Sequence, residues 1–195
     1  MQLIIISGRS GSGKSTALNQ LEDEGYYCID NLPVSLLPSL VEKTSSEEFG
    51  HFRGTAVCID ARNAWKDLAN FGEVMASLPA SVNSEVLFLD AQESALIKRF
   101  SETRRKHPLS SDSMPLAEAI DKERQLLEPI SSAASLVLDT SQMTIYELRD
   151  AVKQRLLGAE SGSMSLLIQS LVSSVEYPPM PIWFSMYACC PTPTG

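Results

Sequence analysis

The sequence contains few cysteines and no long apolar run, and both shortages narrow the choice of protein class. Its four cysteines are Cys28, Cys58, Cys189 and Cys190, and their spacing matches no metal-binding pattern. Cys28 and Cys58 lie in apolar stretches typical of buried thiols, so we expect a reduced, cytoplasmic protein. No apolar run is long enough to span a bilayer, and residues 3–6 are typical of a core strand rather than a leader peptide.

Basic residues are also scarce, which argues against broad binding of nucleic acid by this chain. The 16 Lys and Arg against 24 Asp and Glu leave a formal net charge of −8. The length of 195 residues and the hydrophobic fraction of 44% nevertheless suffice for a globular domain with a sizeable core.

A glycine-rich motif near the start of the chain predicts a phosphate-binding loop (P-loop). Residues 8–15 match the pattern G-x-x-x-x-G-K-[ST]. A β-branched apolar stretch at 3–7 precedes the motif and a helical pattern at 14–24 follows it, which is the strand–loop–helix context that a P-loop needs. A glycine-rich turn that binds nothing is the alternative, and this context disfavours it. The residues expected to hold a polyphosphate are Gly8, Arg9, Ser10, Gly11, Ser12, Gly13, Lys14 and Ser15.

Two residues at the end of the motif have distinct expected roles. Lys14 is expected to stabilise negative charge on the β- and γ-phosphates, and Ser15 to place its hydroxyl on Mg²⁺. The positive N-terminal end of the helix that begins near Lys14 adds to the attraction for an anion.

Apolar stretches alternate with helical patterns along the chain, which predicts a parallel sheet. Strands are expected at 3–7, 26–30, 55–60, 85–90 and 135–139, and helices at 14–24, 34–44, 64–77, 93–105, 115–127 and 144–157. The alternation predicts an α/β fold of the P-loop NTPase, kinase-like type, with a parallel sheet and helices on both faces. We expect this domain to cover residues 1–158.

Four of the predicted strands end in aspartate, and we expect one of these to help hold Mg²⁺. They are Asp30, Asp60, Asp90 and Asp139. Ligands of open α/β sheets bind beyond the carboxyl ends of the strands. Asp60 and Asp90 both follow an apolar run, as a Walker-B-type aspartate does. We favour Asp60, together with Lys14, for the catalytic roles, because a polar cluster suited to contact a nucleotide follows Asp60. The contact residues expected in this cluster are Ala61, Arg62 and Asn63. Helix caps or strand-end turns are the simpler interpretation for at least two of the four.

Basic residues gather in the second half of the predicted helix at 93–105 and just after it; they are Lys98, Arg99, Arg104, Arg105, Lys106 and His107. Small-molecule kinases of the P-loop class carry arginines in a mobile lid that clamps phosphates, and Arg104 and Arg105 suit this role. The alternatives are a cap at the carboxyl end of the helix, a solvated helix face, or a contact patch for a partner.

Several short motifs in a fixed order make the chain resemble the RapZ family, also called YvcJ-like. Besides the P-loop they include Asp30-Asn-Leu-Pro33, Asp60-Ala-Arg-Asn63 and Arg104-Arg-Lys-His-Pro-Leu109, and the matches extend from residue 1 to about 158. The resemblance implies binding and slow hydrolysis of ATP and GTP. It assigns ATP to residues 8–15 and GTP to residues 60–63.

The resemblance also implies partners, namely a small regulatory RNA and an endoribonuclease, in the control of amino-sugar synthesis. In the family this work belongs to a C-terminal domain. Here residues 159–170 are expected to form a linker, and residues 171–195 lack any helical or strand period. We hypothesise that residues 171–195 are an out-of-frame tail, which the nucleotide sequence of the gene would test, and that RNA binding is lost. The motifs do not determine the oligomeric state, and a homo-oligomer is compatible with them.

Two other functions fit the same motifs. A small-molecule kinase would share the P-loop and the lid arginines, and Asp30 and Asn31 would hold the acceptor hydroxyl. A binding or assembly module would use the nucleotide only to set its conformation.

Overall fold

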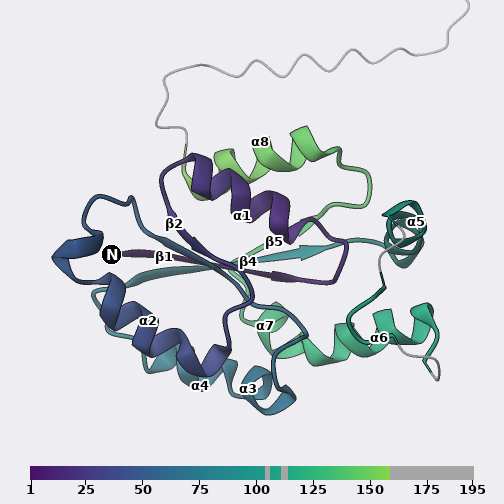
Figure 1. The fold of residues 1–195 in the computed structure, drawn as a ribbon, viewed down its shortest axis with the longest axis horizontal. Helices are drawn as coiled ribbons and strands as arrows, with labels where there is room; N and C mark the ends of the chain where they lie inside the picture. Colours follow the sequence, from purple (N-terminus) through teal and green to yellow (C-terminus); the bar gives the residue numbers. More distant parts are fainter. Residues whose placement is uncertain (104–105, 111–113, 159–195) are drawn as a thin grey trace, which may run out of the picture. The chain divides into compact units, whose positions relative to one another are not determined.

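A five-stranded parallel sheet organises the chain (Figure 1). The strands are β1 (Gln2–Gly8), β2 (Tyr27–Ile29), β3 (Thr55–Cys58), β4 (Asn83–Asp90) and β5 (Leu136–Asp139). Their order across the sheet is β2-β3-β1-β4-β5, and every neighbouring pair is parallel. Because β1 is the central strand, the loop that follows it emerges at the middle of the sheet's carboxyl edge, between the ends of β3 and β4.

The computed structural model describes residues 1–103, 106–110 and 114–158. The predicted lid residues Arg104 and Arg105, the linker at 159–170 and the tail at 171–195 lie outside the described residues. Within the described part, no helix is both long and apolar enough to cross a membrane.

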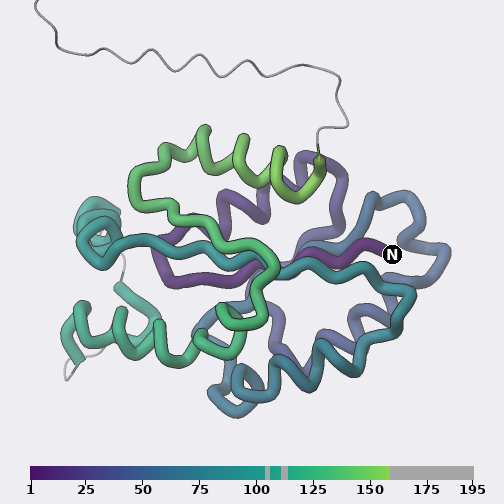
Figure 2. Tube along the Cα trace, turned by 180° about the vertical axis from the view of Figure 1, so that it is seen from behind, coloured from purple at the N-terminus to yellow at the C-terminus, as the bar shows by residue number. Residues whose placement is uncertain are grey.

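Helices cover both faces of the sheet, which gives the three-layer α/β fold predicted from the alternation (Figures 1 and 2). One face carries α1 (Lys14–Asp23) and α8 (Ile145–Leu156). The other carries α2 (Leu37–Thr44), α3 (Trp65–Ala69), α4 (Phe71–Ala76), α6 (Leu116–Leu126) and α7 (Glu128–Ser132). The remaining helix, α5 (Glu93–Thr103), lies beyond the carboxyl end of β4.

Strand β1 contributes side chains to the hydrophobic cores on both faces of the sheet, because successive side chains of a strand point to opposite faces. Ile4 and Ile6 pack in the core that contains Leu18 and Leu148, from α1 and α8. Leu3 and Ile5 belong to the core on the opposite face. All four β1 side chains are fully buried, so the strand has the continuous apolar character typical of a central parallel strand.

Two expected helices are interrupted, and local sequence explains the breaks. The helix expected at 34–44 starts as a 3₁₀ turn, η1 (Val34–Leu36), and becomes α-helical only at Leu37. Pro38 lies in the first turn of α2, where its missing N–H costs nothing, whereas the proline ring excludes a longer α-helix before it. The helix expected at 64–77 breaks at Asn70, two residues before Gly72; asparagine and glycine both have low helix propensity.

Candidate functional site

The loop between β1 and α1 depends on glycines in left-handed backbone conformations. Gly8, Gly11 and Gly13 have φ angles of 143°, 86° and 105°. A Cβ on Gly8 would lie 2.0 Å from the Leu89 carbonyl oxygen, and one on Gly13 would lie 2.5 Å from Leu148 Cδ2. Glycine is therefore required at Gly8 by space as well as by conformation, whereas at Gly13 the positive φ is the main requirement, because the end of the Leu148 side chain can move.

The end of the loop presents the uncapped N-terminus of α1. Gly13 is the N-cap residue, and no side chain caps the helix. The first backbone amides of a helix have no partner within it, so they are available to an anion. The Ala17 amide donates to the Gly13 carbonyl at 3.1 Å, so regular helical bonding begins there.

Lys14 places its ammonium against the first half of the loop. Its Nζ donates to the carbonyl oxygens of Gly8, at 2.8 Å, and of Arg9, at 3.2 Å. The residue is only 9% exposed, and it contributes to the wall of a cavity of about 630 Å³. A buried cation thus borders the cavity next to the uncapped helix end.

The cavity is bounded by four parts of the fold that are distant in sequence. One wall is formed by residues 10–16 of the P-loop and α1, and another by residues at the carboxyl ends of β2 and β3. Helix α5 contributes Arg99 and Phe100, and the segment between β5 and α8 contributes Met143 and Thr144. Its volume lies within the range of small-molecule sites.

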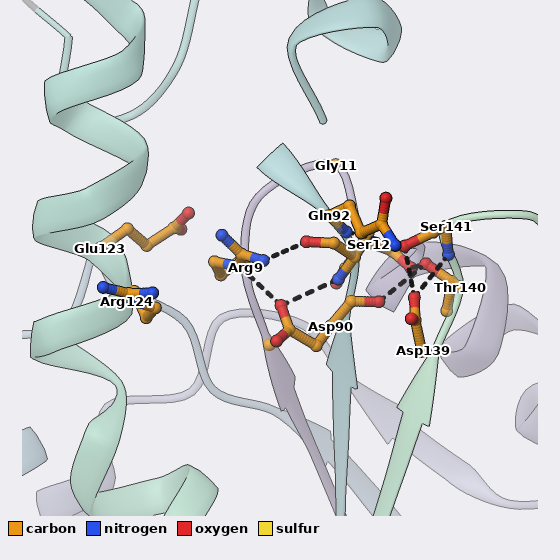
Figure 3. Close-up of polar contacts among 12 residues, drawn as sticks. Arg9, Gly11, Ser12, Asp90, Gln92, Glu123, Arg124, Asp139, Thr140 and Ser141 are labelled. Carbon is orange, nitrogen blue, oxygen red and sulfur yellow. Dashed lines mark hydrogen bonds and ion pairs between the residues drawn. The ribbon is translucent and has the colours of Figure 1, made fainter. Parts of the chain in front are cut away.

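The four strand-end aspartates separate into two pairs. Asp30 and Asp60 line the cavity. Asp90 instead accepts from Arg9 Nε at 2.6 Å, and Asp139 accepts from the Ser141 amide at 2.8 Å. Figure 3 shows Asp90 and Asp139 engaged in these contacts at the ends of neighbouring strands. Asp90 and Asp139 therefore serve as turn and bracing residues.

The segment after β3 is organised around Asp60. Asp60 accepts from the backbone amide of Arg62 at 2.9 Å and from the Arg62 guanidinium at 2.6 and 2.8 Å. This hydrogen bond to Asp60 raises the pKa of Arg62. Of the residues expected to contact nucleotide here, Arg62 lines the cavity. Ala61 is buried, and Asn63 accepts from the Val34 amide at 3.0 Å, which fixes the start of η1.

Arg9 occupies a different place from its neighbours in the motif. Its guanidinium bonds to Asp90 and to the Ala91 carbonyl, so its side chain fastens the loop to the end of β4 (Figure 3). Ser10, Gly11, Ser12, Gly13 and Ser15 line the cavity together with Lys14. Any contact of Arg9 with a ligand would have to come from its backbone.

Two further residues hold the loop, and the motif analysis did not identify either. Arg99 Nη1 donates to the Gly11 carbonyl at 2.9 Å, and Thr140 Oγ1 donates to the Ser12 carbonyl at 2.9 Å. Arg99 also bonds to Thr140. Arg99 belongs to the basic cluster noted in the sequence, but no local pattern announces that it reaches 88 residues back to the loop.

Cys58 lines the cavity beside the charged groups of the site, and its thiol stays protonated. Burial raises the pKa of its thiol to about 12; Lys14 opposes this rise, whereas Asp30 and Asp60 add to it. The thiolate, which is the reactive form, is thus disfavoured at neutral pH. Cys58, Lys14, Asp30 and Asp60 all line the cavity.

The donor atoms around the cavity suit a magnesium ion held jointly with phosphates. Mg²⁺ is usually bound through one or two carboxylates, water and substrate phosphates. Ser15, whose side chain is exposed, and Asp60 both line the cavity. No group of three or more His, Cys, Asp and Glu side chains in the described residues is arranged to hold a metal by itself. The residues therefore fit a metal that arrives with its phosphate ligand.

The fold and the loop define a P-loop protein of the kinase-like α/β class. Residues 1–160 match the family model described as the RapZ-like N-terminal domain, so the chain belongs to this family. The resemblance noted in the sequence is thereby confirmed.

Curated relatives agree with this assignment. A nucleotide-binding protein of Hahella chejuensis is 54% identical over 171 residues, which cover 87% of this chain and 60% of the relative. One from Pseudomonas paraeruginosa is 48% identical over 196 residues, covering 94% of this chain and 68% of the relative. The chain spans about three fifths of the length of the Hahella relative.

A solved structure shares the fold at low sequence identity. The unliganded sugar kinase of Janibacter sp. HTCC2649 aligns with a TM-score of 0.53 and 19% identity. The alignment covers 82% of this chain and 96% of the kinase. This likeness concerns the fold alone.

Proposed function

We propose that this chain binds ATP at residues 8–15 and GTP with residues 60–63, together with Mg²⁺, and that it hydrolyses these nucleotides slowly. The observation that carries the proposal is the buried ammonium of Lys14, which borders a cavity of about 630 Å³ beside the uncapped end of α1. A fixed cation and free helix amides are the two elements that bind a polyphosphate without a dedicated side-chain cage.

The proposed roles follow from position around this cavity. Lys14 neutralises charge on the β- and γ-phosphates, and Ser15 and Asp60 hold Mg²⁺, which supplies further neutralisation of phosphate charge when bound. Arg62 borders the cavity from the segment assigned to GTP. Both Asp60 oxygens already accept hydrogen bonds from Arg62, which is consistent with a slow rather than an efficient hydrolase.

The adapter role with a small regulatory RNA and an endoribonuclease is proposed for the longer proteins of the family. The net charge of −8 makes RNA binding by this chain alone unfavourable. We therefore propose that nucleotide binding at this site controls a part of the longer relatives that this chain does not span.

Calorimetric titration of the 195-residue chain with ATP, GTP and their diphosphates, with and without Mg²⁺, tests nucleotide binding. We expect Lys14→Ala to weaken triphosphate binding by at least about tenfold, because a charged hydrogen-bond donor is lost from the site. Lys43→Ala, which removes an exposed lysine of α2, is the matched control and should bind as the wild type does. Absence of affinity of the folded wild type for any purine triphosphate at millimolar concentration would contradict the proposal.

A second candidate, a small-molecule kinase, is favoured by the position of Asp30. Its carboxylate follows β2 and lines the same cavity as Lys14, where a phosphoryl acceptor would lie. In that reaction Asp30 would accept the proton of the acceptor hydroxyl. The oxygen of that hydroxyl would bond to the γ-phosphorus, and the nucleoside diphosphate would leave. The test is a screen of hydroxylated metabolites with ATP. A metabolite that the wild type phosphorylates over multiple turnovers, and that Asp30→Asn does not phosphorylate, would support the kinase. Hydrolysis at a rate independent of every metabolite would favour the nucleotide-binding protein.

A further inference from the structure

A buried carboxylate from α6 grips the P-loop at its third residue. Glu123 is fully buried, and its two oxygens accept from the Ser10 amide at 2.8 Å and from Ser10 Oγ at 2.7 Å. Figure 3 shows Glu123 extending from its helix toward the loop. The two residues are 113 positions apart in the sequence. Such a two-point contact fixes both the backbone and the side chain of Ser10.

His107 completes this contact from the segment before α6. Its Nε2 lies 3.0 Å from Glu123 Oε2, and its Nδ1 accepts from the Leu109 amide at 3.2 Å. Since Nδ1 accepts, the ring proton lies on Nε2 and is donated to Glu123. The imidazole therefore supports the carboxylate without needing to carry a charge of its own.

Glu123 is held in its ionised form. Burial raises its pKa, but hydrogen bonds from His107 and Ser10, together with the charge of Lys14, lower the pKa overall. A buried ionised carboxylate is costly unless it is fully hydrogen-bonded. Its persistence beside a proposed phosphate site suggests a role connected with that site.

The contacts of Lys14 locate Ser10 relative to a bound nucleotide. In P-loops the amides at the helix start hold the α- and β-phosphates, and the lysine reaches the β- and γ-phosphates. Lys14 Nζ lies against the carbonyls of Gly8 and Arg9, immediately before Ser10. Ser10 lines the cavity, and because it follows the two carbonyls that Lys14 contacts, we place it on the side of the terminal phosphate.

We propose that Glu123 is a positioning residue that sets Ser10 for the γ-phosphate and thereby makes the site prefer triphosphates over diphosphates. The proposal rests on the proposed nucleotide binding. It predicts a selective effect: disturbing Glu123 alters the part of the loop that faces the terminal phosphate, whereas the helix end that holds the inner phosphates stays in place. A merely structural contact would weaken both nucleotides equally.

The test is calorimetric titration of the full chain with ATP and with ADP, both with Mg²⁺, for the wild type and Glu123→Gln. The amide can no longer accept from both Ser10 groups and His107 at once. We expect the affinity for ATP to fall by about tenfold and that for ADP by about twofold or less. Glu118→Gln, the same substitution at an exposed position of α6, is the matched control and should leave both affinities unchanged.

A second variant keeps the test decisive if Glu123→Gln does not fold, as circular dichroism would reveal. Ser10→Ala removes only the hydroxyl contact, and we expect it to lower the affinity for ATP by about threefold while that for ADP is unchanged. Equal losses for ATP and ADP, or no loss for either variant that folds, would overturn the positioning role. Failure of the wild type to bind either nucleotide would instead overturn the proposed function.

Discussion

At the scale of single residues, the glycines of the phosphate-binding loop are required for different reasons. All belong to one motif, which indicates a tight turn but not what surrounds it. Gly8 is the last residue of β1 and pairs with Leu89 of β4, so its missing side chain allows the strand register to continue into the loop. At Gly13, the Leu148 side chain of α8 occupies the space that a Cβ would enter. Only the packed structure shows these neighbours.

Gly8→Ala should be strongly destabilising. A Cβ would lie 2.0 Å from a backbone carbonyl that cannot move without breaking the sheet, and the φ of 143° disfavours any side chain. We expect a loss of about 2 to 4 kcal/mol in the free energy of unfolding, measured by urea denaturation.

Gly72→Ala is the control for this substitution. Gly72 lies within α4, and a Cβ there would meet nothing within 4 Å. We expect a gain of about 0.5 to 1 kcal/mol from improved helix propensity. Similar effects of the two substitutions would show that the contact with Leu89 is not the cause.

At the scale of elements, helix α8 links its own capping to the site. Thr144 and Glu147 form a capping box: the Glu147 amide donates to Thr144 Oγ1 at 3.2 Å, and the Thr144 amide donates to Glu147 Oε2 at 2.8 Å. The cap precedes Leu148, which packs against Gly13 of the P-loop. The start of this helix, predicted within one residue from the sequence, is thus also a support of the loop.

Thr144→Val should weaken α8 without changing the volume of the side chain. Loss of the hydroxyl removes the cap, and we expect a decrease of about 1 kcal/mol in the free energy of unfolding near neutral pH, measured by urea denaturation. Thr144→Ser keeps the hydroxyl and should behave like the wild type. An equal loss in both variants would point to packing rather than capping.

The capping box should also be sensitive to acid. Hydrogen bonds from the backbone and side chain of Thr144 lower the pKa of Glu147 below its ordinary value of 4.5. A carboxyl with a lowered pKa in the folded state stabilises the fold above its unfolded pKa and loses that effect as pH falls through the folded value. The difference between wild type and Thr144→Val should therefore shrink below pH 4.5. A difference that is constant down to about pH 2 would contradict this assignment.

At the scale of the whole molecule, the cavity draws on the P-loop, the ends of β2 and β3, helix α5 and the segment before α8. A ligand that contacts all of these parts binds only the folded state and stabilises it as a unit. The cavity thus offers a test of nucleotide binding that needs no enzymatic activity.

Saturating ATP with Mg²⁺ should raise the melting temperature of the chain. At a concentration about 100 times the dissociation constant, binding adds about 2.7 kcal/mol, which corresponds to about 5 to 10 °C for a domain of this size. The measurement is a thermal scan, with Lys14→Ala as the variant that should show little shift. An equal shift in both proteins would place the ligand away from Lys14.

The extent of successful prediction follows the range of the interactions involved. The apolar stretch at 3–7, the P-loop and the alternation of elements depend on neighbouring residues, and the strand and helix positions were predicted closely from them. The 3₁₀ start before Leu37 and the break at Asn70 were missed, although both have local causes, because the apolar pattern continues across them. Asp30, Asp60 and Asp90 looked alike as strand ends, and only their surroundings separate them.

The sequence by itself determined the parallel α/β class, the phosphate-binding loop and the membership of a family, since each is written in short-range patterns of residues. The tertiary structure decided which side chains hold that loop: Arg9 turns to Asp90, while Arg99, Thr140 and Glu123 reach it from distant helices and turns. These partners are separated from the loop by 81 to 128 residues. Contacts over such separations are set by how the layers pack around the sheet, and no local period of the sequence encodes them.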